Sequence, residues 1–140
     1  MLSKAAARNF FLVGTFLCFG AFVLLTIDTI SKVPAQTNAE NLTDSAIRGK
    51  HIFETNNCMG CHTILGEGAY YAPELTKTYP KRGAEFIRLM LTDPEKLYPG
   101  QRKMVKYDFN EQEKDDVIAF LKWISEMDLN GFPAEPDLMQ

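Results

Sequence analysis

Two cysteines and a histidine stand within five residues of each other, in the stretch Cys58-Met59-Gly60-Cys61-His62. Two thiols separated by two residues, with histidine directly after the second, form the attachment signature of a c-type haem. Each thiol can form a thioether to one edge of the porphyrin, and the short spacing suits a helical turn. His62, on the same turn, is then the expected proximal ligand of the iron. The motif therefore predicts one covalent haem c held by Cys58 and Cys61.

Paired cysteines have other uses in proteins. A thioredoxin-like redox dithiol needs a βαβ context, and no alternating β-like run precedes Cys58. A structural zinc site needs four ligands, and beyond the motif the chain offers only His51 and Cys18. Cys18 lies in an apolar stretch far upstream. Zinc binding and a disulfide stay open as alternatives to haem attachment.

A second strong feature is the run from Phe10 to Ile27, eighteen residues without a charge. At about 1.5 Å per residue this run makes roughly 27 Å of helix, close to the thickness of a bilayer hydrocarbon core. We expect a transmembrane helix over about residues 10–30, within an anchor of residues 1–32. Lys4 and Arg8 precede the run, so the positive-inside rule puts the amino terminus in the cytoplasm of a bacterial cell. The rest of the chain is then periplasmic, attached to the inner membrane.

A cleavable signal peptide is the alternative to a permanent anchor, because Val33-Pro34-Ala35 loosely resembles a cleavage site. Either segment delivers the haem domain to the same compartment. Within the apolar run, Gly14 and Gly20 are positions where another helix can approach closely.

The rest of the 140-residue chain has room for one domain. We expect a polar linker over residues 33–43, a haem domain over residues 44–130 and a tail over residues 131–140. From Gln36 onward there are 12 Lys and Arg against 17 Asp and Glu, a balance of −5. This balance gives no indication of nucleic-acid binding and favours docking on a partner surface with some basic character.

Helical patterns open and close the haem domain. A first helix is expected to begin near Thr43 or Asp44 and to place Gly49 and Phe53 on one face. A last helix is expected after Asn110, which can cap it. In small c-type cytochromes the first and last helices cross each other, so we expect the last helix here to cross the first at Gly49 and Phe53. A short helix is also expected over residues 84–91.

The second iron ligand is expected from Met104, the methionine in an extended basic loop just before the closing helix. Residues 63–75 read as an irregular loop around the haem, and Pro73 resembles the proline whose carbonyl orients the proximal histidine in such cytochromes. A histidine and methionine pair closes both sides of the iron. The domain is therefore expected to carry electrons and to hold no catalytic residue of its own.

With these elements in place, the chain resembles a class I monohaem cytochrome c, an all-α fold, carrying a single N-terminal transmembrane helix. The segments Ala7-Arg8-Asn9, Arg48-Gly49-Lys50 and Asn57 to Leu75, which includes CHTILGEGAYYAPEL, make the resemblance narrower. They are similar to the cytochrome c subunit of bacterial cytochrome c-dependent nitric oxide reductase, over most of the chain. Where that family usually has proline after the ligand methionine, this chain has Val105.

The resemblance implies a large multi-helix catalytic subunit with haem b and non-haem iron, which reduces nitric oxide to nitrous oxide. This chain is then expected to take electrons from a periplasmic donor, such as a small cytochrome c or a cupredoxin, and to pass them to haem b. The resemblance also implies an interface calcium that binds the carbonyl of Gly68 and the hydroxyl of Tyr70. The alternatives are a freestanding membrane-tethered carrier, the cytochrome c subunit of a haem-copper oxygen reductase, and a haem-based gas sensor.

Overall fold

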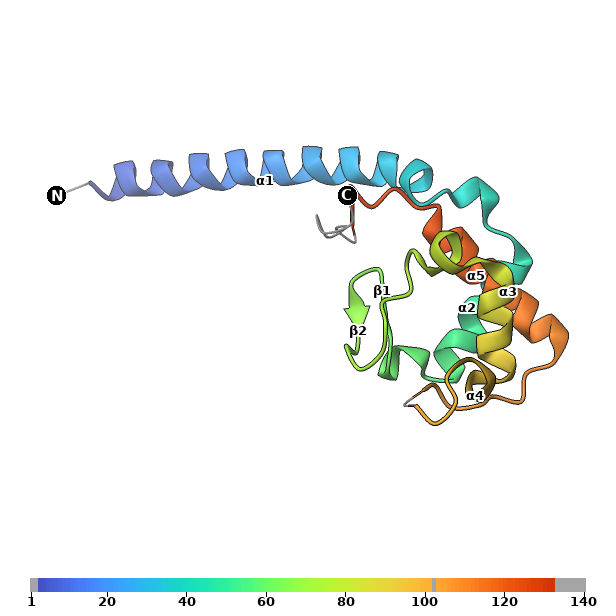
Figure 1. Ribbon diagram of the computed structural model, residues 1–140. Coiled ribbons are helices and arrows are strands. Elements are labelled where there is room, and N and C mark those ends of the chain that lie inside the picture. Colours follow the sequence, from blue (N-terminus) through green and yellow to red (C-terminus); the bar gives the residue numbers. More distant parts are fainter. Residues whose placement is uncertain (1–2, 102, 133–140) are drawn as a thin grey trace, which may run out of the picture. The chain divides into compact units, whose positions relative to one another are not determined.

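The computed structural model describes residues 3–101 and 103–132, which are mostly helical (Figure 1). The chain divides into two units, of which the first ends at Ala35 and the second begins at Gln36. The expected tail falls largely on residues 133–140, which lie outside the described residues. The elements, in chain order, are α1 (Lys4–Gln36), η1 (Ala39–Asn41), α2 (Asp44–Thr55), η2 (Cys58–Gly60), β1 (Thr63–Ile64), β2 (Glu67–Gly68), α3 (Thr78–Thr92), α4 (Pro94–Leu97) and α5 (Glu111–Ser125).

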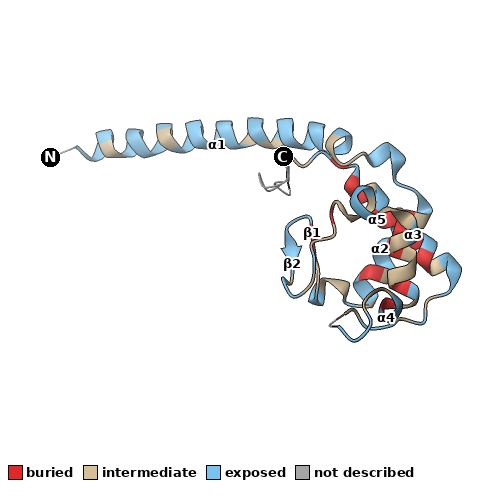
Figure 2. Cartoon of the chain, viewed as in Figure 1, coloured by how far each residue is buried: buried red, intermediate tan, exposed pale blue. Residues whose placement is uncertain are grey.

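Helix α1 contains the whole apolar run and extends beyond the predicted span at both ends. No residue of α1 is buried, and Figure 2 shows it exposed along most of its length. The hydroxyls of Thr26 and Thr29 donate to the carbonyls four residues earlier, at 2.8 and 2.9 Å, so these polar groups are satisfied within the helix. Of the described helices, α1 is long and apolar enough to cross a membrane.

The first residues of the second unit are hydrogen-bonded to α5 and to the chain just after it. The backbone amide of Asp128 donates to the carbonyl of Gln36, at 2.9 Å. The indole Nε1 of Trp123 donates to the carbonyl of Asn38, at 3.1 Å. Much of the linker predicted over residues 33–43 is therefore structured: its first residues form the last turn of α1, and η1 follows. The bounds of the domains themselves stay a prediction.

The predicted crossing of α2 and α5 is confirmed. Gly49 lies against α5 so closely that a Cβ there would overlap the backbone carbonyl of Asp116 and come within 2.8 Å of the Cβ of Phe120. One turn further along α2, the ring of Phe53 packs on that of Phe120, with centroids 5.5 Å apart. Both helices begin as predicted. The side chain of Thr43 caps α2, and Asn110 caps α5.

Helix α3 begins at Thr78, earlier than the predicted start at residue 84. Gly83 has φ 78° and ψ 166°, values that interrupt the helix and that glycine adopts without a Cβ clash. The predicted short helix is the part that follows this kink. It packs on α5 through Ile87 and Leu91, which are both buried. The helices α2, α3 and α5 thus enclose one apolar core, whose buried members are Phe53, Ile64, Ile87, Leu91, Val117, Ile118, Phe120, Leu121, Ile124 and Met127.

Candidate haem site

The CMGCH stretch forms a tight turn at the end of α2. Asn57 has φ 52° and reverses the chain, and the 3-10 turn η2 follows. The amides of Cys61 and His62 both donate to the carbonyl of Cys58, at 3.2 and 2.9 Å. The helical turn predicted from the spacing is therefore present, and it carries both thiols and the imidazole on one short piece of backbone.

The environment of the thiols differs from that of a redox dithiol. Cys58 is half-buried and Cys61 is exposed. Burial raises the pKa of the Cys58 thiol, and the neighbouring Cys61 raises it further. Redox-active cysteine pairs instead have a lowered pKa at the attacking thiol. The turn therefore gives no support to a thioredoxin-like function.

His62 is held in one orientation and one tautomer. Its Nδ1 lies 2.7 Å from the backbone carbonyl oxygen of Pro73. A carbonyl only accepts, so Nδ1 carries the proton and donates, which leaves the lone pair on Nε2 for a metal. This is the arrangement that orients a ligating histidine in metal sites. The predicted contact between Pro73 and His62 is confirmed.

Backbone hydrogen bonds fasten the loop that carries Pro73 to the attachment turn. The amide of Ala72 donates to the carbonyl of Cys61 at 2.8 Å, and that of Ala69 donates to Met59 at 3.0 Å. The loop is more regular than expected, because β1 and β2 form a two-residue antiparallel ladder. Gly68 permits this ladder, since a Cβ at its φ of 117° would meet the carbonyl of His62. Thr76, which is 0% exposed, accepts a 2.7 Å hydrogen bond from the amide of Leu65 and so closes the loop.

Met104 lies in a stretch, residues 103–110, that forms neither helix nor strand. Its side chain is half-buried and packs against the core. In the same stretch, the rings of Tyr107 and Phe109 stack, with centroids 4.9 Å apart and planes 6° apart. Burial raises the pKa of Tyr107, and charge on Cys58 and Cys61 raises it further. Met104 and Phe109 in this stretch and Cys58 in the attachment turn pack against the same core.

The residues around the turn fit a haem c. The turn supplies two thiols, and His62 presents a free nitrogen. The apolar and aromatic side chains that porphyrin faces require are also available. Those that pack at the margin of the core include Met59, Leu75, Tyr79 and Met104. Sequence reasoning did not single out Tyr107, although two aromatic residues spaced two apart in an extended stretch are a signal for a shared face.

Gly68 and Tyr70, the residues implied for a calcium, lie together on the outer part of the loop. Both are exposed, Tyr70 to 86%. Calcium takes six to eight oxygen ligands. Among the described residues, no group of three or more His, Cys, Asp or Glu side chains is placed to hold a metal ion. The calcium therefore has no support from this chain by itself.

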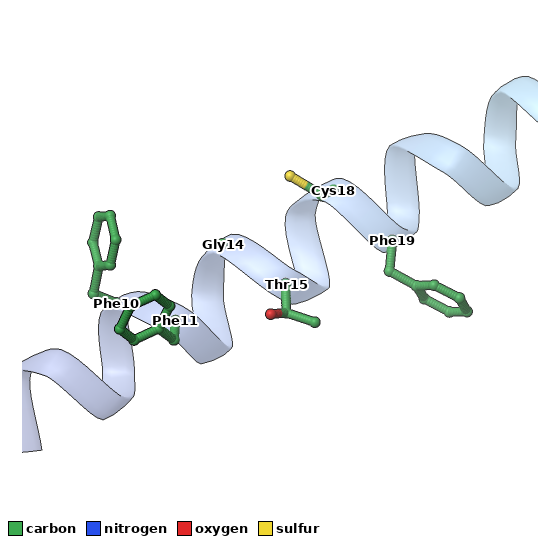
Figure 3. A pocket seen from close by; sticks show the side chains of 6 residues that line it. All are labelled: Phe10, Phe11, Gly14, Thr15, Cys18 and Phe19. Carbon is green, nitrogen blue, oxygen red and sulfur yellow. The ribbon is translucent and has the colours of Figure 1, made fainter.

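A surface hollow lies on α1, and Figure 3 shows the side chains that line it. Gly14, one of the residues that line the hollow, has no side chain, and a Cβ added there would have nothing within 4 Å. The lining of the hollow contains no titratable group besides the thiol of Cys18, so the hollow is better suited to packing against another apolar surface than to binding or converting a polar ligand. It is lined by Phe10, Phe11, Gly14, Thr15, Cys18 and Phe19.

Comparison with known proteins gives consistent matches. A family model described as cytochrome c matches residues 46–125. The chain is 40% identical to the C subunit of nitric oxide reductase from Stutzerimonas stutzeri over 136 residues, which cover 94% of this chain and 93% of that protein. It is 39% identical to the C subunit of nitric oxide reductase from Halomonas halodenitrificans over 144 residues, 96% of each. A similarity to cytochrome c oxidase subunit 2 of Alkalihalophilus pseudofirmus, 28% over 91 residues, covers 59% of this chain and 27% of that protein.

Proposed function

Because this chain belongs to the family of nitric oxide reductase C subunits, which are cytochrome c electron-transfer subunits, we propose that it feeds electrons to a catalytic subunit that reduces nitric oxide to nitrous oxide. In this proposal the chain accepts single electrons from a periplasmic donor, a small cytochrome c or a cupredoxin. It passes them to the haem b of the catalytic subunit, which also holds the non-haem iron. Helix α1 anchors the chain in the inner membrane, with its amino terminus in the cytoplasm.

The arrangement around His62 is the observation that carries the proposal. Cys58 and Cys61 would hold the porphyrin through thioethers, and His62 and Met104 would ligate the iron. The haem, when bound, cycles between ferric and ferrous states and so carries one electron at a time. The hydrogen bond to Pro73 keeps His62 in the ligating tautomer. A second ligand at Met104 leaves no vacant position for a gas, which favours an electron carrier over a sensor.

The calcium belongs to this proposal as a site shared with the catalytic subunit. The exposed loop of Gly68 and Tyr70 would supply a carbonyl and a hydroxyl, and the partner and the haem propionates would supply the remaining oxygens. The purified chain alone is then expected to bind no calcium. In the complex, Tyr70→Phe is expected to lower the calcium content, and Tyr71→Phe serves as the control. Equal calcium content in the wild-type, Tyr70→Phe and Tyr71→Phe complexes would show that Tyr70 is not a calcium ligand.

The test of the main proposal is purification of the full chain in mild detergent from membranes of its own host. We expect a second, larger subunit with haem b to co-purify, and the eluate to consume nitric oxide with a reduced periplasmic donor. A chain that elutes alone with haem c would indicate the freestanding carrier. An eluate that consumes oxygen but not nitric oxide would indicate an oxygen reductase.

A further inference from the structure

Met104 has to be held in place by something other than regular secondary structure. Residues 103–109 form neither helix nor strand, and the residue after Met104, Val105, is exposed. A methionine side chain has three rotatable bonds and adapts readily to its surroundings. A methionine that stays bound to an iron therefore needs its backbone fixed from both sides.

On the amino-terminal side, Lys103 forms an ion pair with Glu95, whose carboxylate also accepts from the amide of Gly100 at 3.0 Å. The two contacts lower the pKa of Glu95, that with Lys103 more strongly. The carboxylate of Glu95 is more than half exposed, however. Exposed ion pairs contribute little and are screened by salt, so this contact is the weaker of the two restraints.

On the carboxy-terminal side, the restraint is the aromatic stack. Tyr107 and Phe109 are two apart in extended chain, so their side chains lie on the same side of the backbone. Their near-parallel rings, with centroids 4.9 Å apart, stack on each other. Phe109 also packs against the core formed by α2, α3 and α5. The stack thus connects the Met104 stretch to the apolar core of the unit.

The attachment turn rests on the same core. Cys58 of the turn packs against it, as do Met104 and Phe109. Tyr107 is half-buried and stacks on Phe109. The stack therefore ties the Met104 stretch to the core that also carries the turn.

We propose that the stacked pair of Tyr107 and Phe109 positions the Met104 stretch against the attachment turn and so keeps the methionine sulfur bound to the haem iron. Tyr107 is then a positioning residue, since it acts through Met104 rather than on the electron itself. This inference rests on the proposed function, because it needs a bound haem with Met104 as a ligand.

The experiment compares Tyr107→Ala with Tyr107→Phe in the full haem-loaded chain. The readout is the far-red absorption band of the ferric protein, which reports a thioether sulfur on the iron. The alanine variant loses the stack and is expected to exchange Met104 for another ligand about tenfold more readily. Its band should therefore bleach about one pH unit lower than that of the wild type. The phenylalanine variant keeps the stack and should match the wild type.

Two further variants separate positioning from a general loss of stability. Phe109→Leu keeps the apolar contact with the core but removes the second ring, and it should behave like Tyr107→Ala. Tyr98→Ala removes a tyrosine of similar exposure outside the stack and should leave the band unchanged. An alanine variant with the wild-type band and bleaching pH overturns the inference, as does a phenylalanine variant as impaired as the alanine variant. A wild-type protein with no far-red band would instead refute Met104 as a ligand, which is a failure of the proposed function.

Discussion

The two residues that we propose as iron ligands depend on different kinds of neighbour. His62 is fixed by a backbone carbonyl eleven residues away, within the same loop. In our proposal Met104 is held by side chains, through the ion pair of Lys103 on one side and the aromatic stack of Tyr107 on the other. A carbonyl cannot be removed by substitution, whereas side chains can. The methionine is therefore the proposed ligand that mutation tests most directly.

Replacing Met104 by leucine is expected to remove the sulfur while conserving most of the volume. The ferric protein should lose its far-red band, and the ferrous protein should bind carbon monoxide, because the sixth position is then open. Met90→Leu, the same change in helix α3, is the control and should alter neither property. If ferrous Met104→Leu excludes carbon monoxide as well as the wild type does, another side chain is the ligand.

At the scale of single residues, the features that could be predicted from the sequence are those that depend on residues close together in the chain. Cys58, Cys61 and His62 lie on the expected turn, and the carbonyl of Pro73 accepts a hydrogen bond from His62, as expected. Tyr107 was not singled out, although its spacing from Phe109 is a local signal. The contact of Phe109 with the core was not predictable, because helices from distant parts of the chain form that core and no local pattern encodes their packing.

The contact between α2 and α5 depends on the absence of a side chain at Gly49. Gly49→Ala is expected to lower the free energy of unfolding by about 1–3 kcal/mol, because the new Cβ would overlap the carbonyl of Asp116 and the helices would have to separate. Urea unfolding followed by the fluorescence of Trp123 measures the change. Lys50→Ala, at an exposed position of the same helix, should cost less than about 1 kcal/mol, as is typical of surface changes.

A buried carboxylate joins the same two helices. Asp116 is 2% exposed and accepts hydrogen bonds from both Nε and Nη2 of Arg48, each at 2.8 Å, and from the hydroxyl of Ser45 at 2.6 Å. The hydrogen bond from Arg48 is the main reason why the pKa of Asp116 falls from 3.8 to about 2. A carboxylate whose pKa is lowered by folding stabilises the fold above its ordinary pKa. That contribution is lost as the pH falls through the folded value.

Asp116→Asn is therefore expected to reduce stability by about 2 kcal/mol at neutral pH. The wild type should lose stability as the pH falls from 3.8 towards 2, and the variant should lose less over the same interval. Chemical unfolding at a series of pH values measures both effects. Asp115→Asn, which breaks an exposed pair with Arg88, should cost less than about 1 kcal/mol. Parallel stability profiles for the wild type and Asp116→Asn would exclude this carboxylate as the acid-sensitive group.

At the scale of elements, the starts of α2 and α5 were predictable because capping residues are local signals. The kink at Gly83 was not, since an isolated glycine in a helical pattern is also compatible with a straight helix. The end of α1 was not predicted either. Pro34 lies in the last turn, where it removes one hydrogen-bond donor without preventing the turn, so the helix continues to Gln36.

The charge of the whole molecule bears on the choice of donor. From Gln36 onward the chain carries a net charge of −5. Electron transfer from a donor with a basic docking face is expected to slow as ionic strength rises from about 10 mM towards roughly 150 mM, as the Debye length shortens. Stopped-flow oxidation of the reduced donor measures the rate. A neutral donor of similar potential is the control, and equal salt dependence for both would show that apolar contact governs docking.

The hydrogen bonds that join Gln36 to Asp128 and Asn38 to Trp123 have a practical consequence for truncation. A soluble fragment cut at residue 44, where the first cytochrome helix starts, would leave the indole of Trp123 without its acceptor and the amide of Asp128 unpaired. A fragment cut just before Gln36 would retain both contacts and discard the apolar run. The second cut is the one we expect to yield a well-behaved water-soluble domain.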